Sequence, residues 1–232
     1  MIRTFDASWH EKATLSDGRK VELRLLRPDD APLLALGFEK LSNESRVRRF
    51  HGPHPQLSAD ELRYLTQIDG ENHFALGALD ATGGEGLGVA RFVRLPQEPR
   101  VAEPAAAVID EIQGTGLGRL LLFRLGAAAR ERGIDWFRCA ILANNEPLRD
   151  LVNRLVPDVV QKLDGDVLRF DIPLAQLEGA APEIERDHPL HPLLVATATG
   201  ALLLAHTAEH VRHWIAERAA RQHPDDGPTE KP

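Results

Sequence analysis

Hydrophobic and polar residues alternate along this chain with the period of strands in some stretches and of helices in others. Residues 21–25 alternate apolar with charged side chains, and residues 73–79 and 86–95 have the composition of two further strands. Residues 30–41 carry an apolar stripe at helical spacing, and a capping box beginning at Ser58 predicts a second helix. The first part of the chain therefore predicts a strand, two helices and a hairpin.

A strand, a glycine-rich turn and a helix follow in the middle of the chain. Residues 105–109 are an apolar run typical of a buried strand, and residues 117–132 repeat leucine and alanine at helical spacing. Between them, Gly114, Gly116 and Gly118 form a turn. The first N–H groups of a helix lack intrahelical partners and carry the positive end of its dipole, so we expect this turn to bind a phosphate. The alternative is that the glycines only make a tight connection.

Further elements follow the long helix. Residues 136–142 predict a strand, residues 144–155 a helix with a proline in its first turn, and residues 159–162 and 167–172 a closing hairpin. The predicted order is strand, two helices, three strands, helix, strand, helix and two strands.

The composition indicates one main domain with an appendage. We assign residues 1–19 to an N-terminal extension and 20–174 to the main domain. Residues 175–192, rich in Pro, Ala and acidic residues, predict a linker, and residues 193–221 an amphipathic helix. That helix packs either on its own domain or on a second subunit, as a homodimer. Residues 222–232 predict a disordered tail.

Net charge and apolar segments restrict the location and partners of the chain. The 232 residues carry a formal charge of −7, which argues against a general nucleic-acid binder. No apolar stretch reaches the length of a signal peptide or of a membrane span. We therefore expect a cytoplasmic protein with neither nucleic acid nor a membrane as its partner.

Cysteine and histidine positions give no indication of a metal site. Cys139 is the single cysteine, which excludes an intramolecular disulfide and a zinc site built on cysteines. His206 and His210 are four residues apart, but no third ligand of matching pattern accompanies them. We expect no metal.

The spacing of the glycines narrows the choice of anion. A dinucleotide-binding turn requires Gly-x-Gly-x-x-Gly and a P-loop requires Gly-Lys-Ser/Thr, and neither is present. Residues 113–118 instead resemble the Gln/Arg-x-x-Gly-x-Gly/Ala turn of the GNAT acetyltransferases. The resemblance implies that this turn holds the pyrophosphate of acetyl-CoA, while the preceding strand lends backbone groups to the pantetheine arm.

The resemblance extends over residues 20–174. Within the superfamily the chain is most similar to bacterial protein lysine acetyltransferases that modify acyl-CoA synthetases. The implied fold is α/β (α+β): a mixed, mostly antiparallel central sheet flanked by helices, here with an extra C-terminal helix. Besides the glycine turn, the resemblance is carried by residues 25–30, 38–46, 57–66, 88–92, 102–103 and 145–148.

Glu103 occupies the position at which these relatives carry a glutamate proposed as general base. A lysine amine has a pKa near 10.4, so it must lose a proton before it attacks a thioester. The alternative for Glu103 is a solvated side chain at a strand entrance. Many superfamily members also use a tyrosine as general acid, but the single tyrosine here is Tyr64, so protonation of the thiolate is left unassigned.

The resemblance also implies the residues that contact the co-substrate. A backbone N–H near residues 106–108 would polarise the thioester carbonyl. Asn145 either contacts coenzyme A or only caps a helix. The expected acetyl-CoA-binding residues are Val108, Ile109, Asp110, Gln113, Gly114, Thr115, Gly116, Leu117, Gly118, Arg119 and Asn145.

These observations lead to a first hypothesis and two alternatives. The first is an acetyl-CoA-dependent N-acetyltransferase that acts on a protein lysine, such as one in an acyl-CoA synthetase, with Glu103 as the base. The second is the same chemistry on a small-molecule amine. The third is a non-catalytic acyl-CoA-binding sensor. The presence of Glu103 favours the two catalytic hypotheses, whereas the absence of a tyrosine general acid is consistent with the non-catalytic sensor.

Overall fold

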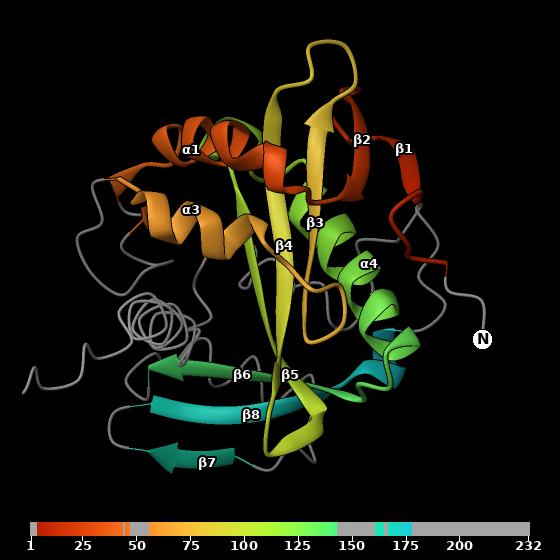
Figure 1. Cartoon of the computed structure of the whole chain (residues 1–232), viewed down its shortest axis with the longest axis vertical. Helices are drawn as coiled ribbons and strands as arrows, with labels where there is room; N and C mark the ends of the chain where they lie inside the picture. The colour runs from red at the N-terminus through yellow and green to blue at the C-terminus, as the bar shows by residue number, and fades with distance from the viewer. Residues whose placement is uncertain (1–3, 44, 47–55, 143–160, 165–166, 178–232) are drawn as a thin grey trace, which may run out of the picture.

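The computed structural model describes residues 4–43, 45–46, 56–142, 161–164 and 167–177. Within them, eight strands form one sheet in the order β1-β2-β3-β4-β5-β6-β8-β7 (Figure 1). The strands are β1 (His10–Thr14), β2 (Lys20–Leu25), β3 (His73–Asp80), β4 (Gly86–Leu95), β5 (Glu98–Val108), β6 (Trp136–Leu142), β7 (Gln161–Asp164) and β8 (Val167–Pro173).

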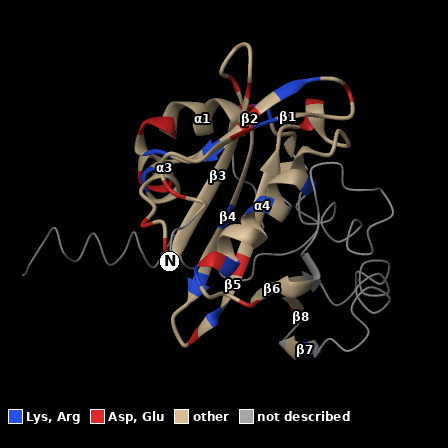
Figure 2. Cartoon of the chain, turned by 90° about the vertical axis from the view of Figure 1, so that its right-hand side faces the viewer, with Lys and Arg blue, Asp and Glu red and all other residues tan. Residues whose placement is uncertain are grey.

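Helices cover both faces of the sheet. Helices α1 (Ala31–Glu39) and α3 (Ala59–Thr66) lie on one face, and α4 (Leu117–Glu131) packs on the other (Figures 1 and 2). On the α4 face, the rings of Phe74 and Phe92 stack with centroids 5.4 Å apart. A Cβ at Gly88 would lie 3.2 Å from Leu121 Cδ1, so a residue without a side chain lets α4 approach β4 closely. The main apolar core therefore lies between the sheet and α4.

One strand pair differs from the others in direction and in length. All neighbouring strands are antiparallel except β5 and β6, which are parallel and are connected through α4. Their register contains only two pairs, Val101 with Trp136 and Ala102 with Phe137. Beyond this point β5 continues along β4, while β6 turns away with β8 (Figure 1). The sheet is thus divided by a gap that begins halfway along β5.

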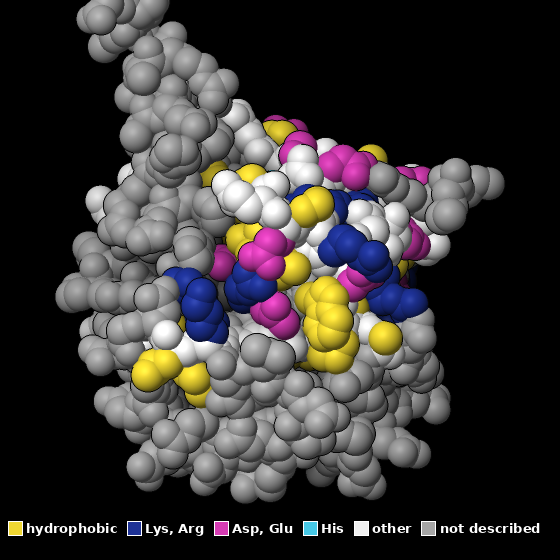
Figure 3. Space-filling model, turned by 90° about the horizontal axis from the view of Figure 1, so that it is seen from below, with side chains coloured by type: hydrophobic (Ala, Val, Ile, Leu, Met, Phe, Trp, Pro, Cys, Tyr) yellow, Lys and Arg dark blue, Asp and Glu magenta, His cyan; other side chains and the backbone are white. Residues whose placement is uncertain are grey.

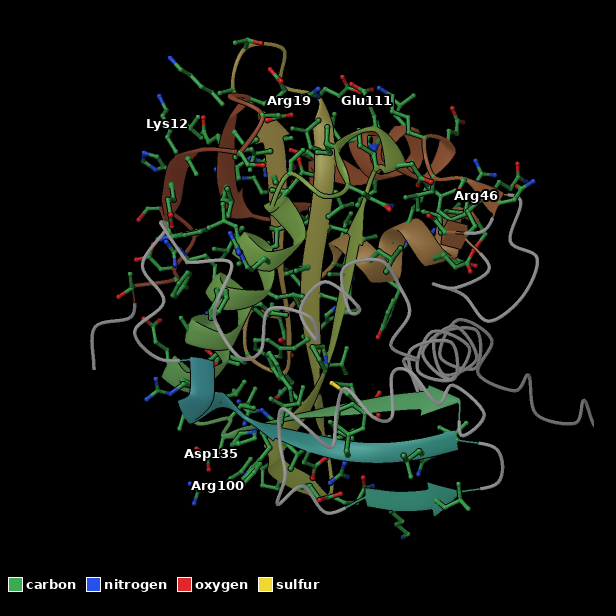
Figure 4. All side chains as sticks on the ribbon, turned by 180° about the vertical axis from the view of Figure 1, so that it is seen from behind. Lys12, Arg19, Arg46, Arg100, Glu111 and Asp135 are labelled. Carbon is green, nitrogen blue, oxygen red and sulfur yellow. The ribbon has the colours of Figure 1, made fainter. Side chains whose placement is uncertain are left out.

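Ion pairs hold β6 where it meets β5. Arg138 of β6 binds Glu98 of β5 and, with Nη2 at 2.7 Å from Oδ2, Asp171 of β8. Arg100 forms an ion pair with Asp135 (Figure 4). Viewed from this end, side chains of both charges lie among hydrophobic ones (Figure 3). These contacts join the two parts of the sheet at one end.

The structure confirms several predicted elements and corrects one. The strands predicted at 86–95 and 136–142 have those bounds, and Ser58 and Glu61 form the predicted capping box. The strand predicted at 105–109 in fact begins at Glu98. Charged residues and Pro99 interrupt its apolar pattern, but pairing with β4 maintains the strand.

The N-terminal extension assigned to residues 1–19 contains a strand that the sequence pattern does not predict. Strand β1 lies within that range and pairs with β2 as part of the sheet. Glu11 binds Arg124 of α4 through two hydrogen bonds of 2.6 and 2.7 Å, and Arg132 donates to the carbonyl of Phe5. The residues of β1 alternate between exposed and half-buried and none is fully buried, because the strand lies at the edge of the sheet, so the sequence lacks a clear apolar alternation there.

The predicted C-terminal segments lie outside the described residues. These are the helix at 144–155, most of the linker at 175–192, the amphipathic helix at 193–221 and the tail at 222–232. The linker's first residues belong to a short 3-10 helix, η3 (Leu174–Leu177).

A buried ion pair joins β2 to the start of α1. Both guanidinium Nη atoms of Arg24 donate to the carboxylate of Asp30 at 2.7 Å, and the backbone N–H of Arg27 donates to the same carboxylate. Burial alone would raise the pKa of Asp30, but these hydrogen bonds outweigh it and lower the pKa. The resulting stabilisation is present above the ordinary Asp pKa of 3.8 and is lost as the pH falls through the lowered folded-state value.

Replacing Arg24 by methionine should therefore lower the free energy of unfolding by about 3–5 kcal/mol, because Asp30 keeps a buried charge without its partner. Urea denaturation at pH 7 measures the loss. Arg63→Met is the matched control, since Arg63 pairs with Asp60 at the surface and such pairs contribute at most about 1 kcal/mol. Equal losses in the two variants would contradict the special cost of the buried pair.

Candidate active site

The glycine turn leads into the N-terminus of α4 as the sequence predicts. Gly114 and Gly116 have φ angles of 81° and 94°, a region that side chains other than glycine rarely adopt. Gly116 is the N-cap of α4, and it has no side chain that could cap the helix. A Cβ at Gly114 would meet nothing within 4 Å. The backbone N–H groups of the first helical turn therefore receive no hydrogen bond from an N-cap side chain, as an anion site at a helix N-terminus requires.

Neighbouring residues hold this turn in shape. The side-chain amide of Gln113 donates to the Val108 carbonyl at 3.1 Å and to Asp110 at 3.3 Å. The carbonyl of Thr115 accepts hydrogen bonds from the backbone N–H and the hydroxyl of Ser16, in the β1–β2 connection. Gln113 and Thr115 thus fix the turn, and Asp110 receives one of the hydrogen bonds that do so.

Basic side chains lie next to the turn. The guanidinium of Arg119 folds back toward it, because its Nη2 would be 3.7 Å from a Cβ at Gly116. Arg19 forms an ion pair of 3.1 Å with Glu111, and both lie at the same end of the sheet (Figure 4). Arg119 therefore adds a positive charge to the N-terminal dipole of α4.

In the part of the chain that the structure describes, the outer edge of β5 is unpaired beside the gap in the sheet. The N–H of Ile109 bonds to the Leu87 carbonyl of β4, so alternate residues from Ile109 backward direct their polar groups toward β4. The intervening residues, Ala106 and Val108 among them, direct theirs toward the side from which β6 has turned away. Pro104, which has no N–H to donate, lies on this edge. Within the described residues, no strand pairs with this part of β5.

Glu103 is buried inside β5 rather than at a strand entrance. The residue is 4% exposed, which contradicts the alternative of a solvated side chain. The register places it opposite Val93 of β4, on the sheet face that α1 and α3 cover. Glu103 therefore lies on a face of the same strand whose edge is open.

The negative charge of Glu103 affects the thiol of Cys139 on β6, on the other side of the gap. Burial first, and then the negative charges of Asp171 and Glu103, raise the pKa of the Cys139 thiol. A buried, neutral thiol of this kind is a poor nucleophile. Cys139 is therefore a core residue.

A largely apolar cavity lies between α1 and the same face of the sheet. Its volume is about 90 Å³, several times the space that one water molecule needs. Arg24, Asp30 and Arg91 are its charged lining residues, and Ala107 and Ile109 connect it to the end of β5. The face that carries Glu103 is thus hollowed next to the residues that lead to the glycine turn.

The structure brings most of the predicted site residues together. The side chains of Val108, Ile109 and Leu117 are buried, so these residues can offer only backbone groups, and Gly118 lies in the first turn of α4. Asn145 lies outside the described residues. Sequence reasoning missed Ser16 and the buried Arg91, for which the sequence alone has no distinguishing signal.

Two classes of feature are not found in the part of the chain that the structure describes. No helix there is long and apolar enough to span a bilayer. In the same residues, no group of three or more His, Cys, Asp and Glu side chains is arranged to hold a metal ion.

Known proteins resemble the chain in sequence. Residues 20–155 match the Acetyltransf_3 family, described as the acetyltransferase (GNAT) domain. Acetyltransferase Pat of Mycolicibacterium smegmatis is 30% identical over 163 residues, which cover 70% of this chain and 49% of that protein. Acetyltransferase PA5475 of Pseudomonas aeruginosa is 32% identical over 144 residues, which cover 61% of this chain and 77% of that protein. The chain thus spans about half the length of Pat.

A solved structure resembles the fold as well. The GNAT domain of S. lividans PAT is 31% identical and superposes with a TM-score of 0.61, over 73% of this chain and 99% of that domain. The family match, the curated relatives and the shared fold point to the same family. The chain belongs to the GNAT family of acetyltransferases.

Proposed function

We propose that this protein transfers an acetyl group from acetyl-CoA to the side-chain amine of a protein lysine, with Glu103 as general base. The observation that carries the proposal is the position of Glu103, buried in β5 where the edge of that strand becomes open toward the glycine turn. One strand thus connects an anion-binding turn with a carboxylate.

The residues of the turn and of β5 fit acetyl-CoA. Its pyrophosphate would be held by the first-turn N–H groups of α4, whose positive dipole is reinforced by Arg119. The open-edge N–H groups of Ala106 and Val108 would bond to the pantetheine arm and to the thioester carbonyl. A well-aligned donor to that oxygen contributes about 3 kcal/mol to the barrier reduction. Bound acetyl-CoA supplies the acetyl group as an activated thioester.

Glu103 supplies the proton acceptor that the reaction needs. The lysine ammonium first gives one proton to Glu103, directly or through a water molecule. The neutral nitrogen then forms its bond to the acetyl carbon, the carbon–sulfur bond breaks and the sulfur leaves as a thiolate, while the second nitrogen proton passes to water, which also protonates the thiolate. Its place on β5 supports this role, because the same strand carries the N–H groups that would hold the thioester.

No side chain is assigned to protonate the leaving thiolate. Tyr64 is buried on α3, where its ring lies 4.9 Å from that of His73. We therefore assign the proton to water.

A protein lysine as acceptor rests on the resemblance to bacterial protein lysine acetyltransferases. The carrying stretches include residues 25–30 and 88–92, and these belong to the strands and turn that border the cavity under α1. An acyl-CoA synthetase is the protein substrate that this resemblance favours.

Replacing Gly116 by glutamate should abolish acetyl-CoA binding, because a negative side chain would occupy the place proposed for the pyrophosphate. Isothermal titration calorimetry measures the affinity. Gly84→Glu is the matched control, since Gly84 also has a positive φ, of 68°, and a Cβ there would meet nothing within 4 Å. Micromolar affinity retained by a folded Gly116→Glu variant would exclude the turn as the pyrophosphate site.

Replacing Glu103 by glutamine should lower kcat about 100-fold or more while leaving the affinity for acetyl-CoA unchanged, because the amide cannot accept the proton. Coenzyme A release with an acyl-CoA synthetase as acceptor measures kcat, and mass spectrometry identifies the acetylated lysine.

Glu98→Gln serves as the control for Glu103→Gln on the same strand. Glu98 hydrogen-bonds Arg138 away from the open edge, so this variant should retain its turnover. An unchanged kcat in Glu103→Gln would remove Glu103 from the mechanism. Turnover with small amines but with no protein would replace the protein substrate by a metabolite, and binding without turnover on any acceptor would favour the sensor.

A further inference from the structure

Arg91 is a buried cation on the sheet face that carries Glu103. It is 2% exposed and lies in the middle of β4. The register pairs Arg91 with Ala105 and Val93 with Glu103, so the two charged residues are diagonal neighbours on one face. Such diagonal neighbours are about 7–8 Å apart, with their Cβ atoms somewhat closer. Arg91 and Glu103 therefore place opposite charges close together in a region shielded from water.

Contacts with α3 and β3 fix the guanidinium of Arg91. Its Nη1 lies 3.1 Å from the carbonyl oxygen of Leu65 and 3.0 Å from Nε2 of His73. Arginine can only donate, so Nε2 of His73 is the acceptor, and the ring is neutral with its proton on Nδ1. His73 is itself packed against Tyr64. The positive charge is thus held in place by the elements that cover this face.

We propose that Arg91 is a positioning residue that keeps the buried carboxylate of Glu103 ionised, so that it can act as the base. This inference rests on the proposed function of Glu103. Burial disfavours a carboxylate, and a buried carboxylate without a compensating charge would hold its proton at neutral pH. Arg91 opposes that effect through its field across the sheet.

Three other described titratable groups near this face supply no positive charge. Nε2 of His73 on β3 accepts from Arg91, which leaves the ring neutral, and Tyr64 on α3 is not positively charged in either of its protonation states. The thiol of Cys139 on β6 is held neutral by burial and by nearby negative charge. Among these described groups, Arg91 carries the positive charge.

The sign of the pH effect follows from this arrangement. Removing a nearby positive charge disfavours the ionised carboxylate and raises the pKa of Glu103. For unit charges about 7–8 Å apart at an effective dielectric constant of about 20, the expected rise is about 1–2 pH units. The acidic limb of the kcat/KM profile should then move to higher pH by the same amount.

The test is the pKa of Glu103 in the wild type and in Arg91→Met. Side-chain carboxyl ¹³C resonances of glutamate-labelled protein report this pKa directly, and the resonance absent from Glu103→Gln identifies the residue. We expect a rise of about 1–2 units in Arg91→Met, with kcat/KM recovering at high pH. An unchanged pKa of Glu103 in Arg91→Met would overturn the proposal.

Two further variants protect the test against loss of folding. Arg91→Gln also removes the charge but keeps a donor for the Leu65 carbonyl, and it should raise the pKa in the same way. Arg91→Lys keeps the charge and should leave the pKa of Glu103 within about half a unit of the wild type. Equal pKa values in the glutamine and lysine variants would contradict an effect of charge.

Arg24→Met is the matched control, because it removes another arginine that lines the same cavity. Arg24 lines the same cavity, but its charge is paired with Asp30. This variant should lose stability without moving the pKa of Glu103.

If Glu103→Gln keeps full turnover while the pKa of Glu103 still rises in Arg91→Met, the proposed function fails and the electrostatic inference stands. If Glu103 is essential but its pKa does not respond, only the inference about Arg91 fails.

Discussion

The early separation of β6 from β5 is the constraint on which the rest of the site depends. The two strands share only two register pairs, and Arg138 and Asp171 hold β6 with β8 instead. A strand inside a sheet normally has both edges paired, because unpaired backbone groups are costly when buried. Among the described residues, the separation leaves an edge of β5 without a neighbouring strand, and Pro104 lies at its beginning. An extended ligand can complete that edge as an additional strand would.

Strand β5 carries both backbone hydrogen-bond donors, on its edge, and a carboxylate side chain, on its face. Its edge presents backbone donors that lead to the glycine turn, and its face presents Glu103 to the layer formed by α1 and α3. Because the side chains of a strand stand perpendicular to its hydrogen bonds, the carboxylate and the open edge do not compete for space. Arg91, anchored on the neighbouring strand, then sets the electrostatic environment of that face. A donor on the edge and an acceptor amine on the face would meet at the middle of β5.

Local sequence patterns predict the turn and most of the elements, whereas long-range pairing determines the site. Gly114 and Gly116 predict the turn because their positive φ values are a local requirement. The burial of Glu103 could not be predicted, since charged residues obscure the start of β5 and only its pairing with β4 extends the strand. The gap depends on β6 pairing with β8, residues far apart in sequence. The contact of Arg91 with His73 likewise arises from strand register, for which neither residue carries a signal.

Amide hydrogen exchange with and without acetyl-CoA tests the central claim most directly, because that claim concerns backbone groups. The account predicts slower exchange at Ala106 and Val108 and in the first turn of α4, around Gly118, when acetyl-CoA is bound, with little change on β2 and β3. Unchanged exchange at Ala106 and Val108 under saturating acetyl-CoA, with protection appearing elsewhere, would contradict the open edge of β5 as the binding site.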